Sequence, residues 1–578
     1  MNALEIQTER VDDIPLLMAQ QQKMGIVKII DEVIKSHGNR RGLSVGEMVQ
    51  VWLSYILSEG DHRMVVVEDW ISSRLTLLGD LIGKPVSPKD FTDDRLANIL
   101  EVLDDDETWA SIETKLGEHM IQVYRLSDTE DTVIRLDSTS VSGHHQITED
   151  GLFQYGYSKD YRPDLAQYKV MLATLDPMGM PMASLIVSGE KSDDGLYIPA
   201  IQRSQRIVGK GNHLYVGDSK LSARDNRGYI AQSGDYYLTV LPRRHQGNDE
   251  ISQWLQPVFG GKQGITAVKI SKNERKGEVL WALGYETTRQ QQAEVEGKSY
   301  HWQERVAVVF RPSQAKQERH FLVKRLQSAE KALQQLVSKR WQRDPRWKSL
   351  AVLEAAAQGI VKKHRVDGFL DIDCQRHEED RSVRGYGDRP TRTETWIRYT
   401  MTIQRNGQAI REARQKLGWR LYVTNAPPEQ LSFQKVVTTY RDAPRIELDF
   451  RRLKGHPLGV RPVYIHRDDH TVGLSRLLML ALRVLTLTEF VVREKLQQQQ
   501  EELLGLYPGQ PKRATNQPTT ERLLRAFKGI DLSLVKLGGQ LLRHITHLSP
   551  LQHQILELLG LSEAIYDDLA SSEPQFPP

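Results

Sequence analysis

The 578-residue sequence contains a single cysteine, Cys374. One thiol excludes an internal disulfide, a multi-cysteine zinc site and an iron–sulfur cluster. A long uninterrupted apolar run is also missing, because the longest, roughly residues 472–492, contains Arg476 and Arg483. We expect this run to be a buried helix of a soluble domain rather than a membrane span. The first ten residues lack a basic-then-apolar signal pattern, so we expect a cytoplasmic protein.

A nucleotide-binding loop is missing too. No Gly-x4-Gly-Lys-Ser/Thr pattern occurs, and Gly209-Lys210-Gly211 lacks its spacing, so we expect no nucleotide cofactor. The composition is that of an ordinary globular chain, with 39% hydrophobic and 26% charged residues. It excludes a disordered or collagen-like protein, and the length predicts two to four domains.

Charge is unevenly distributed along the chain. Residues 1–136 contain 14 Lys or Arg against 25 Asp or Glu, a net charge of −11, whereas the whole chain sums to +3. The remainder therefore carries +14. This imbalance indicates either a polyanionic partner for the second portion or an ordinary solvated surface.

Local patterns divide the chain into five parts. Ser44-Val-Gly-Glu47 is a capping box that opens an apolar helix through Leu57, one of several helices expected before residue 127. From Thr132 a short β-branched strand, a hairpin around Asp176-Pro-Met-Gly179, and alternating helices and strands predict a mixed sheet flanked by helices. We predict a helical N-terminal domain (1–127), an α/β core in two parts (128–241 and 418–469), a β-containing insertion (242–417) and a helical C-terminal domain (470–578).

Two aspartates stand at expected strand ends. Asp137 ends the strand that begins at Thr132, and Asp218 follows the strand His213–Gly217. If these strands are parallel neighbours, the two carboxylates lie side by side and require a cation, for which magnesium is the expected choice. The alternative is local turn chemistry, in which Asp218 caps the following helix.

A third carboxylate lies on a predicted helix. In the segment Tyr440–Pro457, a buried stripe at i, i+4 and i+7 is expected from Ile446, Phe450 and Leu453. Glu447 and Lys454 are seven residues apart, two helical turns on one face, which suits a metal ligand and a phosphate contact. A solvated face with ion pairs is the alternative.

These segments together resemble the DDE transposases of bacterial insertion sequences, in the group with a Tyr-x2-Arg-x3-Glu-x6-Lys signature. Tyr440, Glu447 and Lys454 match it in type and spacing, whereas Ala443 occupies the arginine position between Arg441 and Arg445. The segments 156–164 and 461–464 also resemble that family.

The resemblance implies a ribonuclease H-like fold with a β-rich insertion between the second Asp and the Glu, here 229 residues apart. It implies that Asp137, Asp218 and Glu447 are catalytic and hold two Mg²⁺ ions, for which Mn²⁺ substitutes. It also implies a homodimer on double-stranded DNA, comprising element ends and target, and association with the bacterial nucleoid when bound. The implied DNA-binding residues are Tyr440, Arg441, Arg445, Arg451 and Lys454.

The predicted function is therefore a DNA transposase that cleaves the ends of an insertion sequence and joins them to target DNA. Between residues 441 and 467, seven Lys or Arg accompany three acids, as a surface facing the DNA backbone requires. Two alternatives remain. One is a metal-dependent DNA nuclease of the same fold, and the other is a non-catalytic DNA-binding protein derived from a transposase.

Overall fold

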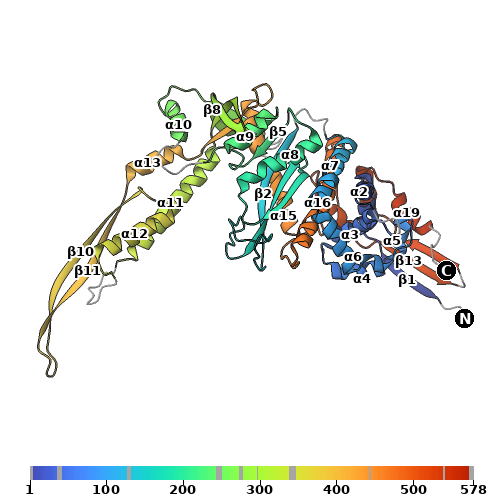
Figure 1. Cartoon of the computed structure of the whole chain (residues 1–578), viewed down its shortest axis with the longest axis horizontal. Coiled ribbons are helices and arrows are strands. Elements are labelled where there is room, and N and C mark those ends of the chain that lie inside the picture. The colour runs from blue at the N-terminus through green and yellow to red at the C-terminus, as the bar shows by residue number, and fades with distance from the viewer. Residues whose placement is uncertain are drawn as a thin grey trace.

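The computed structural model describes residues 4–35, 42–126, 132–242, 250–271, 277–295, 297–337, 347–441, 444–537 and 540–571. The chain is a multidomain mixed α/β protein arranged along one long axis (Figure 1). N-terminal and C-terminal elements pack together at one end, a large sheet lies in the middle, and a narrow arm projects at the other end.

One mixed sheet organises the middle of the molecule. Within the described residues its strand order is β4-β3-β2-β5-β6-β12-β9-β8-β7. The first half comprises β2 (Val133–Gly143), β3 (Ala166–Leu175), β4 (Met180–Ser188), α8 (Tyr197–Val208), β5 (Leu214–Gly217), α9 (Arg224–Gln232) and β6 (Tyr236–Val240). Strands β2, β5 and β6 are parallel, whereas β3 and β4 form the predicted antiparallel hairpin beside β2. The expectation of a mixed sheet flanked by helices is confirmed.

The stretch predicted as an insertion contributes three strands to this same sheet. Its first part comprises α10 (Glu250–Phe259), β7 (Thr266–Ser271), β8 (Glu278–Val295) and β9 (Lys298–Phe310). Strand β9 pairs with β12 (Trp419–Thr424), which pairs with β6, both antiparallel. The long β8–β9 hairpin therefore extends the sheet that carries the two aspartates.

The rest of that stretch forms the projecting arm (Figure 1). It comprises α11 (Pro312–Gln334), α12 (Leu350–His364), β10 (Leu370–Val383), β11 (Arg392–Arg405) and α13 (Gly407–Lys416). Strands β10 and β11 pair only with each other among the described strands. Leu322, Leu326 and Leu333 of α11 are buried in a small core with α12, so the apolar face of α11 packs within the arm.

Three helices follow β12. They are α14 (Phe433–Arg441), α15 (Pro444–Lys454) and α16 (Asp468–Gln499). The apolar run near residue 480 is indeed a buried helix, α16, and its arginines are paired: Arg476 contacts Asp106, and Arg483 Nη2 lies 3.2 Å from Glu113 Oε1. Within the described residues, no helix is long and apolar enough to cross a membrane.

The N-terminal part is built from helices around a shared apolar core. Its elements are β1 (Glu5–Arg10), α1 (Ile14–Lys23), α2 (Ile26–Val33), α3 (Val45–Glu59), α4 (Val67–Ser72), α5 (Leu75–Ile82), α6 (Asp93–Asp104) and α7 (Asp106–Val123). The predicted capping box opens α3: the Glu47 N–H donates to Ser44 Oγ at 3.1 Å, and the Ser44 N–H donates to Glu47 Oε2 at 2.8 Å.

The C-terminal part is not wholly helical, which corrects the sequence prediction. It comprises α17 (Thr520–Arg525), β13 (Asp531–Leu537), β14 (Gln540–Ile545), α18 (Pro550–Leu559) and α19 (Ala564–Ser571). Residues 531–537 alternate, with Leu532 and Leu534 buried and Ser533 half-exposed, which is strand rather than helix periodicity. The same correction applies to the N-terminal part, because β1 pairs with β13 in a sheet of order β1-β13-β14.

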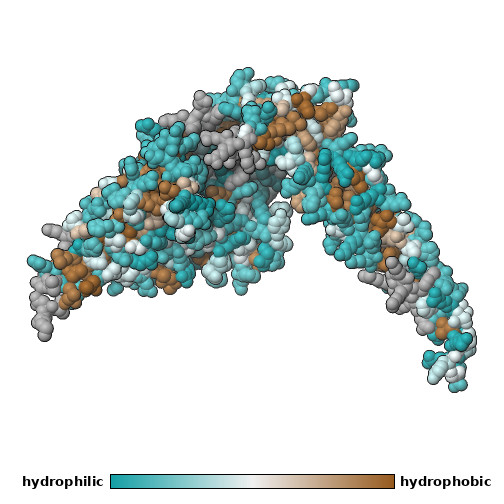
Figure 2. All heavy atoms as spheres, turned by 180° about the vertical axis from the view of Figure 1, so that it is seen from behind, coloured by the Kyte–Doolittle hydropathy of each residue, from teal (hydrophilic) through white to brown (hydrophobic). Residues whose placement is uncertain are grey.

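This small sheet leaves an apolar row open. Ile6, Val535 and Leu542 are register partners across the three strands, and Ile6 and Leu542 are well exposed. Seen from behind, the surface is mostly hydrophilic, with an apolar patch at the end that carries β1 and β13 (Figure 2).

Candidate active site

Asp137 and Asp218 are neighbours across two parallel strands. The register of β2 and β5 pairs Val133 with Leu214 and Leu136 with Gly217, so the next pair in the same register is Asp137 and Asp218. The prediction that Asp137 ends its strand is wrong, because β2 continues beyond it to Gly143 and pairs there with β3; Asp218 is the first residue after β5, as predicted. The predicted juxtaposition of the two carboxylates therefore follows from the sheet itself.

The Asp137 carboxylate is only 28% exposed and lies against a lysine. Burial raises its pKa above the ordinary value, and the nearby Asp218 charge adds to the rise, whereas Lys159 opposes it. Lys159 Nζ lies 3.4 Å from Asp137 Oδ1 and donates to Ser138 O at 2.5 Å. Among the side chains that the structure describes, the cation that contacts this acid therefore comes from the segment 156–164.

Asp218 is held by two donors. The Tyr197 hydroxyl donates to Asp218 Oδ1 at 2.7 Å, and the Lys220 N–H donates to the same oxygen at 2.8 Å. Burial and the Asp218 charge raise the pKa of Tyr197 well above its ordinary value, so this tyrosine stays a neutral donor. The N-cap of α9 is Ala223, so Asp218 shapes the turn after β5 and does not cap that helix.

Glu447 lies on α15, which packs against β2. Ile446, Phe450 and Leu453 are buried as predicted, and Glu447 is exposed beside them. Two hydrogen bonds tie the helix pair to the strand: Arg135 Nη2 donates to the Thr439 carbonyl at 2.9 Å, and Lys454 Nζ donates to the Ser140 carbonyl at 3.2 Å.

The two hydrogen bonds lie on either side of Asp137 and Glu447 in the sequence. Asp137 lies between Arg135 and Ser140 on β2, and Glu447 lies between Thr439 and Lys454 on the helices. Of the two helices, α15 packs against β2, whereas α14 packs against β6, β8 and β9. The helix that contains Glu447 therefore packs against the strand that contains Asp137.

Tyr440 is half-buried near both aspartates. Its ring meets Tyr422 edge-on, with centroids 4.9 Å apart. Burial raises its pKa, and the charges of Tyr422, Asp218 and Asp137 raise it further. The tyrosine of the signature, Tyr440, therefore lies near both aspartates and stays a neutral phenol.

Lys454 is committed to a protein carboxylate. Its ammonium lies 2.7 Å from Asp160 Oδ1, and Arg461 Nη1 lies 2.7 Å from Asp160 Oδ2. The lysine side chain is only 14% exposed, and burial lowers its pKa. The Lys of the signature thus joins α15 to the segment 156–164, a partnership that its sequence spacing could not reveal.

The remaining predicted DNA contacts lie on α14 and α15. Arg445 donates to the Pro177 carbonyl and lies 3.9 Å from Asp176 Oδ1, and Arg451 is exposed. The side chain of Arg441 lies outside the described residues, as does Ala443. Arg445 therefore fastens α15 to the β3–β4 turn, and Arg451 faces solvent.

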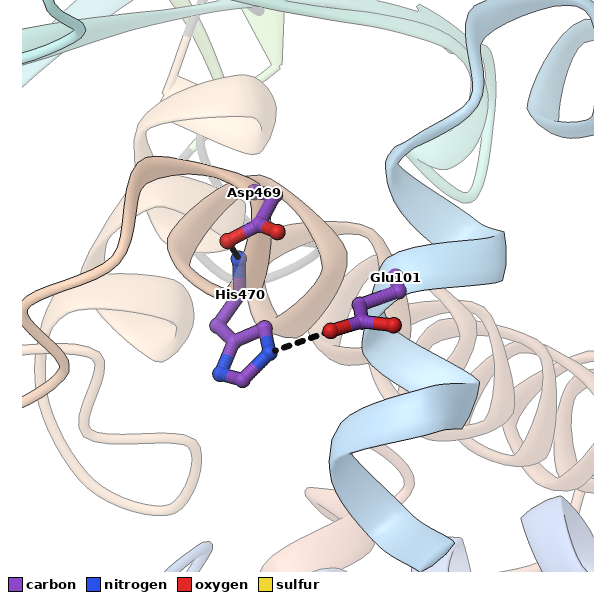
Figure 3. A group of neighbouring side chains, drawn as sticks. All are labelled: Glu101, Asp469 and His470. Carbon is purple, nitrogen blue, oxygen red and sulfur yellow. Dashed lines mark hydrogen bonds and ion pairs between the residues drawn. The ribbon is translucent and has the colours of Figure 1, made fainter. Parts of the chain in front are cut away.

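A second cluster of possible metal ligands lies elsewhere. Donor atoms of Glu101 on α6 and of Asp469 and His470 at the start of α16 lie within 4.8 Å of one another (Figure 3). His470 Nε2 is 3.4 Å from Glu101 Oε1, but Arg467 Nη2 also contacts Glu101, at 2.7 Å, and Asp469. The arginine already contacts both carboxylates, so this cluster acts as an ion-pair connection between two helices. The sequence signal was the run Asp468-Asp469-His470.

Comparison with known proteins gives three results. Residues 6–113, from β1 into α7, match a family model described as a domain of unknown function (DUF4277). No curated protein sequence matches the chain. Among solved structures, one match is the cryo-EM structure of a piggyBac transposase synaptic complex with hairpin DNA, at 10% identity and a TM-score of 0.25. That match covers 52% of this chain and 63% of the transposase chain, so this chain spans less than two thirds of that relative.

Proposed function

We propose that this protein is a metal-dependent DNA transposase that uses Asp137, Asp218 and Glu447. The observation that carries the proposal is the in-register placement of Asp137 beside Asp218, with the helix of Glu447 tied along the same strand. In this proposal the carboxylates of Asp137, Asp218 and Glu447 form one acidic centre, with the basic residues of α15 beside it.

A ribonuclease H-like core is part of this proposal. The order β4-β3-β2-β5-β6 combines an antiparallel hairpin with parallel strands whose carboxyl ends face one edge. Acidic side chains at such an edge are displayed together outside the sheet, where a polyanionic substrate can reach them. The two-part core and the insertion boundaries at residues 242 and 417 belong to the same proposal.

The donor set suits magnesium. Three carboxylates provide hard oxygen ligands, and the raised pKa of Asp137 reflects burial together with an adjacent negative charge that a cation would relieve. Asp137, Asp218 and Glu447 would hold the ions, with Mn²⁺ able to substitute. When bound there, divalent ions would supply Lewis-acid chemistry for phosphodiester cleavage and transfer.

The surrounding residues orient this centre. Tyr197 donates to Asp218 and fixes its carboxylate, while Tyr440 lies near enough for the charges of both aspartates to raise its pKa, which keeps it a neutral phenol. We propose that Arg441, Arg445 and Arg451 contact the DNA backbone. Lys454 supports this surface indirectly, since it holds Asp160 and thus the segment that delivers Lys159 to Asp137.

A strand-transfer assay tests this function. Pre-cut DNA carrying the terminal sequences that flank the gene should be joined to target DNA in Mg²⁺. Cleavage without joining would identify a metal-dependent nuclease instead, and binding without either reaction would identify a non-catalytic DNA-binding protein.

The proposed working unit is a homodimer on DNA, because paired ends cut in one complex can be joined together without leaving a broken chromosome. The open apolar row of Ile6, Val535 and Leu542 is a surface available for a second copy. Mixing Glu447→Ala protein with a catalytically intact variant that cannot bind ends should restore cleavage. Cleavage by a complex shown to hold one protein and one end would contradict pairing.

A further inference from the structure

A basic cavity opens directly beside Asp218. It has a volume of about 360 Å³ and begins at the two residues that follow the aspartate. Its lining is polar and comes from the loop after β5, the start of α9, the end of β6 and strand β8; it includes Ser219, Lys220, Arg224, Arg227, Arg289 and Asp194. Four of these six side chains are cationic.

A buried acid positions two of the four cations. Glu304 on β9 is fully buried and contacts Arg227, while Arg289 Nε lies 2.7 Å from Glu304 Oε2. The Tyr237 hydroxyl donates to Glu304 Oε1 at 2.5 Å and accepts from Trp302 Nε1 at 2.8 Å. This network fixes both guanidinium groups at the cavity wall. It also shows that Trp302 packs in the core and donates inside the protein.

Cations outnumber acids in the cavity lining. Lys220, Arg224, Arg227 and Arg289 line it together with one carboxylate, Asp194. Lys220 Nζ lies 3.4 Å from Asp194 Oδ1, so that pair is locally neutral, and Arg227 and Arg289 both contact Glu304. A cavity lined by more cations than acids favours a bound anion.

Arg224 is the cation best placed to meet that anion. It is the first residue of the nine-residue helix α9, is exposed, and makes no ion pair with any residue that the structure describes. The helix N-terminus beneath it adds N–H groups that also favour negative charge. A second cavity of about 620 Å³ shares Arg224 and Gln291 and continues along β8 past Gln292.

We propose that this cavity binds a backbone phosphate of the DNA strand that enters the carboxylate site, with Arg224 as its main contact. This assignment rests on the proposed function, because the cavity adjoins Asp218. The bound phosphate belongs to a neighbouring nucleotide rather than the scissile one.

Binding measured without catalysis tests the proposal. A short fluorescein-labelled DNA duplex with an unpaired end is titrated with full-length protein in EDTA at several salt concentrations. Arg224→Ala should weaken binding by about 3-fold to 10-fold and make the slope of log K against log salt shallower by about 0.7–0.9. Arg224→Lys should largely keep the slope. Arg206→Ala is the matched control, since Arg206 is exposed on α8 and does not line the cavity.

Three outcomes would overturn the proposal. An unchanged slope for Arg224→Ala would show that no phosphate is bound there, and an equal loss for Arg206→Ala would show only general surface charge. Inorganic phosphate is titrated in a parallel thermal-unfolding series. Stabilisation that requires Arg224, with an unchanged DNA slope, would assign the cavity to a free anion instead. If Arg224-dependent binding persists but no variant or wild-type protein cleaves DNA, the proposed function fails and the cavity assignment stands.

Discussion

Asp137, within β2, and Asp218, directly after the parallel strand β5, lie at adjacent positions one step beyond the register partners Leu136 and Gly217. The sheet therefore holds two acids at neighbouring positions. Burial raises the pKa of Asp137, and the Asp218 charge adds to that rise. Such a pair is stabilised when a divalent cation binds between the carboxylates.

Metal binding is expected to depend on this pair. Titration of Mn²⁺ followed by electron paramagnetic resonance should show wild-type binding that falls at least about tenfold in Asp218→Asn, because removal of even a supporting group of a metal site costs about that much. Glu101→Gln is the control, since Glu101 belongs to the separate cluster that already contains Arg467. Loss of Mn²⁺ in the control alone would place the ion at α6 and α16.

Lys454 and Asp160 should be energetically coupled. Because the ammonium contacts Asp160 at 2.7 Å and the Ser140 carbonyl at 3.2 Å, Lys454→Ala should destabilise the protein and leave the salt dependence of DNA binding nearly unchanged. A double-mutant cycle with Asp160→Ala in urea unfolding should give a coupling free energy of about 0.5–3 kcal/mol. If Lys454→Ala makes the salt dependence of DNA binding shallower and the cycle gives no coupling free energy, Lys454 contacts a DNA phosphate directly, as the signature predicted.

Arg483 and Glu113 form a fully buried pair that joins α16 to α7. Arg483 Nε also donates to the Pro181 carbonyl at 2.9 Å. Arg483→Met should lower the free energy of unfolding by about 3–5 kcal/mol, because the buried Glu113 keeps only the more distant guanidinium of Arg203, 3.8 Å away, and the Ser184 hydroxyl. The added substitution Glu113→Leu should recover part of that loss. Lys115→Met, which breaks a half-exposed pair on the same helix, should cost less than about 1 kcal/mol.

Asp13 should make stability depend on pH. Burial raises its pKa above the ordinary 3.8, although Lys528, 3.8 Å away, and the Ser58 hydroxyl at 2.5 Å both oppose the rise. The folded state therefore holds its proton more tightly than the unfolded state, so this contribution to stability is greatest below pH 3.8 and is lost as pH rises through the raised pKa.

The variant Asp13→Asn should reduce the fall in the free energy of unfolding as pH rises. Chemical unfolding at several pH values between about 4 and 7 measures this dependence. The adjacent Asp12 also faces Lys528, so Asp12→Asn is measured in parallel. A wild-type slope retained in Asp13→Asn would assign the pH dependence to another group.

Local pattern was sufficient for the elements that carry the acids. The turn signal at residues 176–179, the β-branched run before Asp137 and the i, i+4, i+7 stripe of Ile446, Phe450 and Leu453 each predicted an element that the structure contains. These features depend on neighbours in sequence, which a single chain displays directly.

Long-range partners could not be predicted in this way. Lys454 pairs with Asp160, 294 residues earlier, and Glu304 supports Arg227 from a strand 77 residues later. The spacing of these residues in the sequence does not predict either contact. The leucine-rich C-terminal segment was wrongly predicted as wholly helical, because its period-two alternation at residues 531–537 is short and lies between true helices.

Single-turnover cleavage of duplex DNA carrying the element end, in Mg²⁺, tests the central claim most directly. Asp137→Asn, Asp218→Asn and Glu447→Gln should each slow release of the 3′-hydroxyl end by about a thousandfold or more, with DNA binding nearly unchanged, whereas Glu101→Gln should cleave normally. Cleavage at a near wild-type rate by any one of the three carboxylate variants would contradict the account.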